Sequence, residues 1–350
     1  MRPRLTPRPD DLHSQQPCDE IGKDAKHCRG RTEICVFFAA GFHAPEVEVK
    51  SRPSALANLG AFPTLPSPMA PIRRLAFVVN RTKRSAHDLA NDLVALARST
   101  KVKTKVFARA PLPESALMGF DACCVVGGDG TLLGAAREAA RAGVPVIGVN
   151  RGSLGFLTTF SAEEAVAQFP SLLAGDYQLA ERSLLSCRTG PDQEDVALND
   201  VVIKDEINSK LVRLGVYADN EFVTDYHGDG LLVATPTGST AYNLSAGGPI
   251  IHPGADAIVL TPICPHTLSN RSVILRSGVK LRIESRMEDS QLLVAMDGQR
   301  NLVTCAGRDI EIAVADRRLT LVQKPGYEHF EVLRSKLGWS GAATGHPARR

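Results

Sequence analysis

The sequence predicts a two-part fold, in which an N-terminal α/β domain with a parallel sheet is followed by a C-terminal β-sandwich. Two observations predict it. Apolar runs alternate with helical patterns from Arg73 to about residue 150, whereas many short apolar runs separated by turns follow after about residue 185. The first pattern is typical of parallel α/β sheets, and the second is typical of sandwiches. A chain of 350 residues is long enough for about two domains.

The α/β domain is expected over residues 69–165. Its predicted elements alternate between short buried strands and helices, and a candidate N-cap (Ser85) and a closing glycine (Gly143) mark helix ends. In chain order they are a strand at Leu75–Val79, a helix at 85–98, strands at Val102–Phe107 and Ala122–Val126, a helix at Thr131–Arg141 and a strand at Pro145–Val149.

The all-β domain is expected over residues 166–324, and the tail 325–350 is expected to pack back on the α/β domain. The tail carries Phe330, Val332, Leu333 and Leu337, enough for a short amphipathic segment. The predicted strands are Val196–Ile203, Leu211–Ala218, Leu231–Thr235, Ile258–Thr261, Val279–Ile283, Leu292–Ala295, Ile310–Val314 and Leu319–Val322.

Residues 1–68 differ from the rest of the chain. They are rich in Pro, Arg, His and Ser and show no sustained periodicity, and their one apolar run, Ile34–Phe42, is too short to span a bilayer. Two interpretations remain open. The segment is either a disordered tail or the product of a mis-assigned start codon, because Met69 directly precedes the first convincing strand.

The composition is that of a globular protein without a nucleic-acid or membrane partner. Hydrophobic residues make up 43% and charged residues 23% of the chain, and the net charge of +3 is too small to indicate either partner. The eight cysteines form no CxxC pair, so we expect reduced thiols in a cytoplasmic protein.

A glycine-rich loop, Gly127-Gly128-Asp129-Gly130-Thr131, follows the predicted strand Ala122–Val126 and precedes a helix. Free backbone N–H groups in such a loop attract anions. A carboxylate inside it would repel them unless a cation or a reacting hydroxyl faces it. The loop therefore indicates phosphoryl transfer, although Asp129 could also simply cap the helix.

Two further segments are chemically unusual. The long block from Asp229 to Pro249 contains a run of small hydroxyl residues, Thr237–Ser245, which as structure is a turn leading into a short helix. Asn199 and Asp200 interrupt an apolar, strand-like run. Asp is disfavoured within strands, so this pair forms either an edge turn or a ligand contact.

These motifs together resemble those of NAD kinases, which add a phosphate to the 2′-hydroxyl of the adenosine ribose of NAD. The resemblance covers about residues 69–340 and implies an α/β part similar to phosphofructokinases and diacylglycerol kinases. The motifs that carry it are Gly127–Thr131, Gly152-Ser153-Leu154-Gly155-Phe156, Asn199-Asp200, Asp229–Pro249, Thr261–His266 and Asp297-Gly298-Gln299.

The resemblance implies a role for each site residue. Asp129 would be the general base for the 2′-hydroxyl, Asn199 would contact NAD, and Asp200 would hold ribose hydroxyls where the family usually has Glu. Asp229 would lie near the nicotinamide side. The other residues implied to bind NAD are Gly130, Phe156, Lys210, His227, Thr240, Ala241, Tyr242, Asn243, Leu244, Ser245 and Gln299.

The resemblance also implies the co-substrates. Gly127, Gly128, Gly130 and Thr131 would cradle the phosphates of ATP or polyphosphate. Mg²⁺ or another divalent ion would be carried by those phosphates, with no direct protein ligand. The partners would be NAD and ATP, and the enzyme, a cytoplasmic transferase of NADP biosynthesis, would be a homodimer or homotetramer.

Two other functions share part of this pattern. A lipid kinase would carry the Gly-Gly-Asp-Gly loop but would lack residues 229–249. A non-catalytic NAD sensor would carry Gly-x-Gly-x-x-Gly after its first strand. Here the first strand is followed by Asn80-Arg81-Thr82 instead.

Overall fold

The computed structural model describes residues 69–80, 84–108, 110–150, 155–206, 210–267, 269–287, 291–304 and 308–339. The expectations for residues 1–68, for Gly152-Ser153-Leu154 and for the tail beyond residue 339 lie outside these described residues. Within them, no helix has the length and apolar character needed to cross a membrane.

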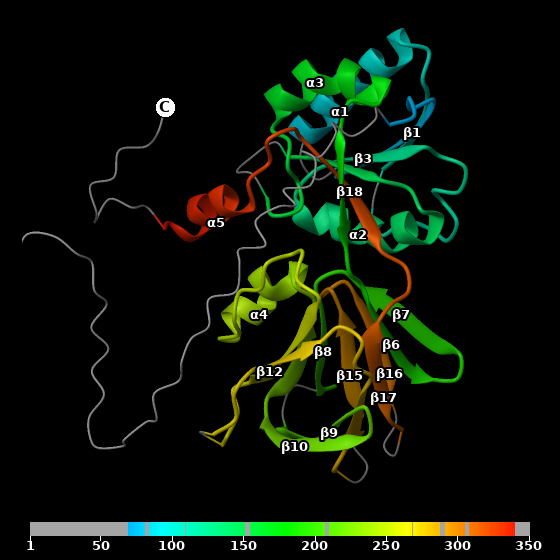
Figure 1. Cartoon of the computed structure of the whole chain (residues 1–350). Helices are drawn as coiled ribbons and strands as arrows, with labels where there is room; N and C mark the ends of the chain where they lie inside the picture. Colours follow the sequence, from blue (N-terminus) through cyan, green and yellow to red (C-terminus); the bar gives the residue numbers. More distant parts are fainter. Residues whose placement is uncertain are drawn as a thin grey trace, which may run out of the picture. The chain divides into compact units, whose positions relative to one another are not determined.

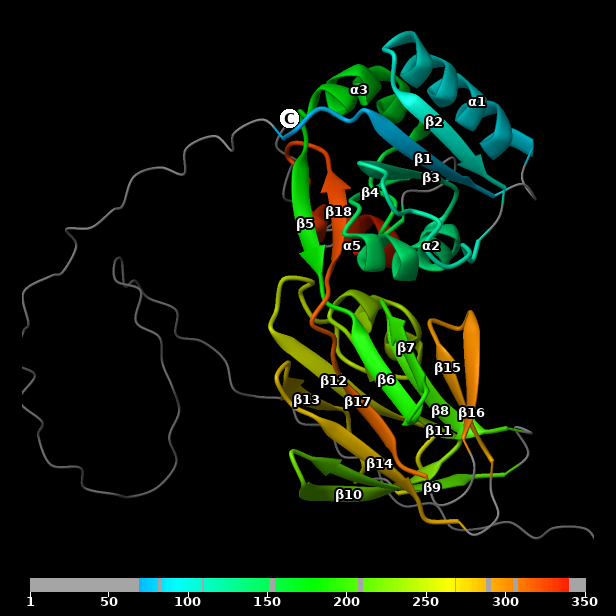
Figure 2. The same ribbon diagram turned by 90° about the vertical axis from the view of Figure 1, so that its right-hand side faces the viewer.

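The first sheet has six strands in the order β2-β1-β3-β4-β18-β5 (Figure 2). All neighbouring strands run parallel except β5, which is antiparallel to β18. The predicted parallel sheet is thus confirmed, with one antiparallel edge strand added. The strands are β1 (Arg74–Val79), β2 (Lys103–Phe107), β3 (Ala122–Val126), β4 (Val146–Val149), β5 (Gln178–Arg182) and β18 (Leu319–Gln323).

Helices cover both faces of this sheet (Figures 1 and 2). Helices α1 (Arg84–Ser99) and α3 (Ala162–Ala174) pack on the face that carries Phe77, and α2 (Asp129–Ala142) packs on the face that carries Val78. Neighbouring strand residues point to opposite faces, so an unbroken apolar strand such as β1 fills two cores.

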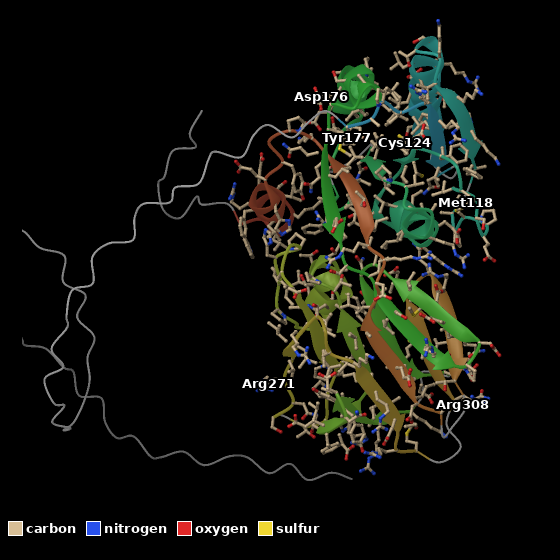
Figure 3. The ribbon with its side chains drawn as sticks, turned by 45° about the vertical axis from the view of Figure 1, so that its right-hand side comes forward. Met118, Cys124, Asp176, Tyr177, Arg271 and Arg308 are labelled. Carbon is tan, nitrogen blue, oxygen red and sulfur yellow. The ribbon has the colours of Figure 1, made fainter. Side chains whose placement is uncertain are left out.

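The apolar core between the first sheet and helices α1 and α3 includes side chains from β3 and from the segment just before β5. Cys124 is fully buried there, and Tyr177 packs against the same apolar cluster; both are labelled in Figure 3. Burial raises the pKa of the neighbouring Cys123 thiol to about 12, and that of Cys124 is raised as well. These thiols behave as small hydrophobic side chains.

The strands of the first sheet do not respect the domain boundaries expected at residues 165 and 324. Strands β5 and β18 lie inside the range assigned to the all-β domain, yet both belong to the α/β sheet. A short apolar run such as Leu319–Val322 indicates a buried strand but does not say which sheet contains it.

Two helix starts also differ from expectation. Helix α1 begins at Arg84, so Ser85 lies inside its first turn and is not the N-cap. Helix α2 begins at Asp129, two residues before the predicted start, and Gly128 is its N-cap. Its end agrees with the prediction, because Gly143 closes it in the left-handed conformation, with φ of 64°.

The other twelve strands form two antiparallel six-stranded sheets, ordered β10-β9-β14-β17-β6-β7 and β13-β12-β11-β8-β15-β16. Side chains from both sheets meet in one apolar cluster, as in the predicted sandwich. The strands are β6 (Leu185–Gly190), β7 (Gln193–Ala197), β8 (Asp200–Asp205), β9 (Val212–Ala218), β10 (Glu221–Gly228), β11 (Gly230–Ala234), β12 (Ala257–Ile263), β13 (Val273–Arg276), β14 (Leu281–Ser285), β15 (Leu292–Met296), β16 (Arg300–Thr304) and β17 (Ile310–Val314).

The remaining helices are short. The 3₁₀ turn η1 (Thr237–Thr240) and α4 (Tyr242–Ser245) follow β11, and α5 (His329–Leu337) follows β18. The described contacts of the tail include the rings of His329 and Phe330, which lie 5.3 and 5.9 Å from the His252 ring in the segment after α4. The described part of the tail therefore contacts the chain that follows α4, and its packing on the α/β part stays a prediction.

Candidate active site

Asp129 occupies the first position of α2, directly after β3. Its carboxylate does not cap the helix. Instead, Oδ2 accepts a bond from the Phe156 N–H at 2.9 Å, and Oδ1 accepts bonds from the N–H groups of Leu157 at 3.2 Å and Thr158 at 3.1 Å. The Thr158 hydroxyl adds a fourth bond at 3.0 Å. The loop after β4 thus holds the carboxylate in one orientation at the start of a helix.

Gly155 makes this close approach possible, and Gly127 allows a second one, to the side chain of Thr131. A Cβ atom on Gly155 would lie 2.0 Å from Asp129 Oδ1 and 2.4 Å from the Thr158 hydroxyl. A Cβ atom on Gly127 would lie 2.6 Å from the Thr131 hydroxyl. Only a residue without a side chain fits at either place, so the glycine-rich sequence and the carboxylate geometry depend on each other.

Asn199 and Asp200 lie at the start of β8, where the predicted strand Val196–Ile203 is broken into β7 and β8. The carboxylate of Asp297 accepts bonds from the N–H groups of Leu198 at 3.0 Å, Asn199 at 2.7 Å and Asp200 at 3.3 Å. Between β7 and β8, these bonds to Asp297 take the place of the backbone hydrogen bonds that a continuous strand would make with its neighbour. The two polar side chains are therefore placed by a turn that a distant residue holds.

Asp200 sits in an unfavourable place for a negative charge. Only 5% of its surface is exposed. Burial, followed by the nearby charge of Asp297, raises the pKa of Asp200 from 3.8 to about 7. A carboxyl group with such a pKa exchanges its proton near neutral pH, which is typical of functional sites.

A pocket of about 770 Å³ opens beside this pair. Its volume is in the range of a small-molecule or cofactor site. Leu133 of α2 contributes to a wall otherwise formed by the sandwich and α4. The other lining residues are Asn199, Asp200, Val202, Lys204, Lys210, Leu211, Asp229, Ala241, Tyr242, Ile263, Cys264, Ala295, Asp297 and Gly298.

The pocket thus brings together six of the residues expected to bind NAD. They are Asn199, Asp200, Lys210, Asp229, Ala241 and Tyr242. Tyr242 is 45% exposed, so its ring is available to a ligand. The positive side chains of Lys204 and Lys210 line the same pocket as the carboxylates, and this suits a ligand that carries both hydroxyl and phosphate groups.

Asn243 was expected to touch NAD, and its side chain is engaged elsewhere. Its Nδ2 donates to the carbonyls of Ser239 at 3.1 Å and Pro249 at 2.9 Å, and its Oδ1 accepts from the Thr261 hydroxyl at 2.7 Å. It is fully buried. These bonds fasten α4 to β12, and a contact between Asn243 and NAD stays a prediction.

Other expected residues lie outside the large pocket. Phe156 and Thr240 line a small cavity together with Arg182 and Tyr327. The half-buried ring of His227 lies 5.2 Å from that of His266, to which no role was given. Leu244 is half-buried and Ser245 is exposed on α4, and the pocket lining includes neither.

Gln299 contacts the glycine-rich loop and not the pocket wall. Its Nε2 donates to the Gly130 carbonyl at 2.6 Å. Gly130 itself is exposed, whereas Thr131 is buried. The turn that carries Asp297 and Gln299 therefore contacts both the α/β part and the sandwich.

Sequence reasoning assigned no role to several residues at the site. Asp297 and Cys264 belong to motifs but received no role of their own, and Lys204, Arg182 and Tyr327 received none either. The signal for Asp297 was the Asp-Gly pair of a hairpin turn, which indicates geometry but not a bonding partner. Among the described residues, no three His, Cys, Asp or Glu side chains form a group that could hold a metal ion.

Comparisons with known proteins agree on one family. Residues 80–177 match the model of the ATP-NAD kinase N-terminal domain, and residues 198–324 match that of the ATP-NAD kinase C-terminal domain. An NAD kinase of Syntrophotalea carbinolica is 44% identical over 223 residues, which are 63% of this chain and 78% of that protein. An NAD kinase of Tolumonas auensis is 46% identical over 226 residues, 63% of this chain and 77% of that protein.

Two crystal structures have a similar fold. A yeast NADH kinase complexed with NADH superposes with a TM-score of 0.68 at 23% identity, over 80% of this chain and 90% of that chain. An NAD kinase from Archaeoglobus fulgidus in complex with ATP superposes with a TM-score of 0.63 at 24% identity, over 76% of this chain and 97% of that chain.

Proposed function

This chain belongs to the NAD kinase family, whose members phosphorylate NAD to NADP, and we propose that it does so with Asp129 as the general base. The observation that carries this proposal is the carboxylate of Asp129, which four hydrogen bonds hold at the start of α2. A base that is already oriented loses little entropy when the substrate binds.

In the proposed reaction, the 2′-hydroxyl of the adenosine ribose attacks the terminal phosphorus of the donor. The O–P bond to NAD forms as the bond to the leaving phosphate breaks, and Asp129 accepts the hydroxyl proton. Phosphoryl transfer has a loose transition state, so most of the catalysis comes from positioning and from stabilisation of charge. A base that orients the hydroxyl fits this requirement.

NAD would occupy the pocket beside β8. Asn199 and the ionised Asp200 would accept bonds from ribose or amide groups, and Tyr242 would pack against a ring. Asp229 and Lys210 line the same pocket and would meet the more distant half of the dinucleotide. Phe156, Thr240, His227, Leu244, Ser245 and the backbone of Asn243 remain proposed contacts that depend on the resemblance to the family.

The donor would bind at the loop of Gly127, Gly128, Gly130 and Thr131. The N–H groups of Gly127 and Thr131 already donate to the carbonyls of Val149 and Gly128, so the N-terminal end of α2 is the part of this loop that would favour the anion. ATP or polyphosphate would supply the phosphoryl group, and Mg²⁺ or another divalent ion held by the donor phosphates would neutralise their charge. Asp129 would face the hydroxyl rather than the phosphates.

Three broader features belong to the same proposal. The α/β part would have a fold similar to that of phosphofructokinases and diacylglycerol kinases. The protein would act in the cytoplasm, where its thiols stay reduced. It would assemble as a homodimer or homotetramer, like other NAD kinases.

One assay tests the proposed reaction. The purified chain is incubated with NAD, Mg²⁺ and either ATP or polyphosphate, and NADP is measured. We expect NADP from at least one of the two donors. If neither donor yields NADP while NAD still binds, the assigned reaction is wrong for this chain; formation of NADP with one donor only identifies the donor.

A further inference from the structure

The hairpin turn between β15 and β16 touches both halves of the site. It consists of Asp297, Gly298 and Gln299, which we call the linking turn. Asp297 has a φ of 53° and Gly298 a φ of 62°, so two successive residues adopt the left-handed conformation. A non-glycine residue in this region is uncommon, and such strain is retained mainly where a structure or function requires it.

The first contact of the linking turn is with the sandwich. Asp297 accepts three backbone N–H groups from residues 198–200, and its own N–H donates to the Asp200 carbonyl at 2.9 Å. The carbonyls of Leu198 and Asn199 accept bonds from Thr235, whereas their N–H groups donate to Asp297. The carboxylate of Asp297 supplies acceptors for these N–H groups, so the position of the Asn199 and Asp200 side chains depends on it.

The second contact is with the loop that carries the base. The Gln299 amide donates to the Gly130 carbonyl at 2.6 Å, one residue after Asp129. A Cβ atom on Gly134, one turn further along α2, would lie 3.2 Å from Gln299 Oε1, so the helix and the Gln299 side chain are closely packed. Across the described residues, the two amino acids that flank Gly298 therefore bond one to each half of the site.

We propose that Asp297 and Gln299 are positioning residues for phosphoryl transfer, and that the linking turn sets the distance between the NAD-binding pair and the base. Asp297 fixes Asn199 and Asp200, and Gln299 fixes the Gly130 end of the loop. This inference rests on the proposed kinase function. It assigns to Gln299 a contact with the protein in place of the expected contact with NAD.

The charged groups around Asp200 allow a pH-dependent test that is specific to the proposed role of Asp297. Asp200 is faced by Asp297 from the turn, and Lys204, Lys210 and Asp229 line the same pocket. Behind the turn, Arg300 is paired with Asp195 at 2.7 Å. The charge of Asp297 helps to raise the pKa of Asp200, so its removal should let Asp200 ionise at a lower pH.

The test of Asp297 is Asp297→Asn, because Asn tolerates the left-handed conformation but lacks the second acceptor oxygen and the charge. We expect the Kd for NAD, measured by calorimetry without donor, to rise by about tenfold at pH 8, as expected for the loss of about 1.4 kcal/mol. The acidic limb of the pH dependence of NAD binding should also move to lower pH. Unchanged affinity together with an unmoved acidic limb would overturn the role of Asp297.

The matched control is Asp219→Asn. Asp219 also lies in a hairpin turn with positive φ, at 49°, and its carboxylate also accepts a backbone N–H, from Lys280 at 3.0 Å. It belongs to the β9–β10 turn and lines no part of the NAD pocket. We expect its Kd for NAD and its pH profile to match those of the wild type. Changes equal to those of Asp297→Asn would show a general effect of losing a turn carboxylate and would overturn the inference.

The test of Gln299 is independent of Asp297 and decides the inference if Asp297→Asn does not fold. Gln299→Ala removes the bond to Gly130, and Gln299→Glu places a carboxylate against that carbonyl. We expect kcat to fall by about tenfold in Gln299→Ala and further in Gln299→Glu, with the Kd for NAD within twofold of the wild-type value. A rise in Kd with unchanged kcat would instead make Gln299 a direct NAD contact. Since Kd is measured without donor, a wild type that binds NAD but makes no NADP would contradict the kinase function separately.

Discussion

The α/β part and the sandwich each contribute a carboxylate to the site, and they hold it in opposite ways. Asp129 is partly buried and receives four hydrogen bonds from the loop after β4. Asp200 is buried near a second carboxylate, and its pKa is raised to about 7. The first arrangement fixes the direction of a charged group. The second makes the charge itself dependent on pH, so we expect the two residues to control different steps.

The largest effect is expected from the change Asp129→Asn. Asn keeps the size of the side chain but cannot accept the hydroxyl proton, so turnover should fall by roughly 10²- to 10⁴-fold. Steady-state NADP formation measures this loss, and the exposed Asp176→Asn variant is the control. Turnover within threefold of the wild type would eliminate Asp129 as the base.

A smaller loss is expected when the support of Asp129 is changed but the carboxylate is kept. In Gly155→Ala, the new Cβ would lie 2.0 Å from Asp129 Oδ1, so the carboxylate must move. A displacement of about 1 Å costs roughly 10²-fold in rate. Gly190→Ala is the matched control, because its Cβ would have only ordinary contacts, the nearest at 3.7 Å. Equal activity of the two variants would mean that the orientation of Asp129 is unimportant.

The pH dependence of stability should reveal the unfavourable burial of the Asp200 carboxylate. Because its pKa is raised from 3.8 to about 7, folded Asp200 retains a proton over this range that the unfolded chain has lost. This group therefore makes stability fall as pH rises from 3.8 to about 7, and the loss is complete above that value. Asn cannot ionise, so Asp200→Asn should unfold at a higher temperature than the wild type at pH 8 and at a similar temperature at pH 4.

The unfolding temperatures of Asp200→Asn and of the wild type are measured at several pH values. The Asp129→Asn variant, changed at a second carboxylate of the same site, is measured alongside them. NAD binding to Asp200→Asn should weaken at pH 8, because the ionised acceptor is gone. If Asp200→Asn is no more stable than the wild type at pH 8, the carboxyl group is not held in an unfavourable charged state.

The smallest effect is expected from deletion of residues 1–68. The sequence there shows no periodicity, and the folded chain begins its described contacts at Met69, whose N–H donates to the Gly175 carbonyl at 3.0 Å. A chain that starts at Met69 keeps this bond. We expect its unfolding temperature and NADP formation to match those of the full chain. An insoluble or inactive product would show that residues 1–68 contribute to the fold or to the site.

Local signals in the sequence predicted much of the fold and the position of Asp129. The apolar strand, the glycine-rich loop and the helix after it are neighbours in the chain, so Ala122–Val126 and the place of Asp129 could be derived directly. The strands that were missed or shortened include β7, β10, β13 and β16, which are the four edge strands of the sandwich. Edge strands are partly solvated, so their residues lack a continuous apolar signal.

Contacts between distant residues could not be predicted in the same way. Asp297 bonds to Asn199 across 98 residues of sequence, and Gln299 bonds to Gly130 across 169. Nothing in the spacing of these residues indicates such pairs. The internal bonds of the Asn243 side chain are likewise absent from the local pattern, because its partners include Thr261, 18 residues away.

We propose that the sandwich binds NAD and that the α/β part supplies the base. An NAD binding titration of the Asp129→Asn variant at pH 8 tests this assignment most directly. If the sandwich binds NAD and Asp129 only accepts the proton, the Kd for NAD should stay within about threefold of the wild-type value, which corresponds to less than about 0.7 kcal/mol. A rise in Kd of a hundredfold or more would contradict the account, because the α/β carboxylate would then hold the nucleotide itself.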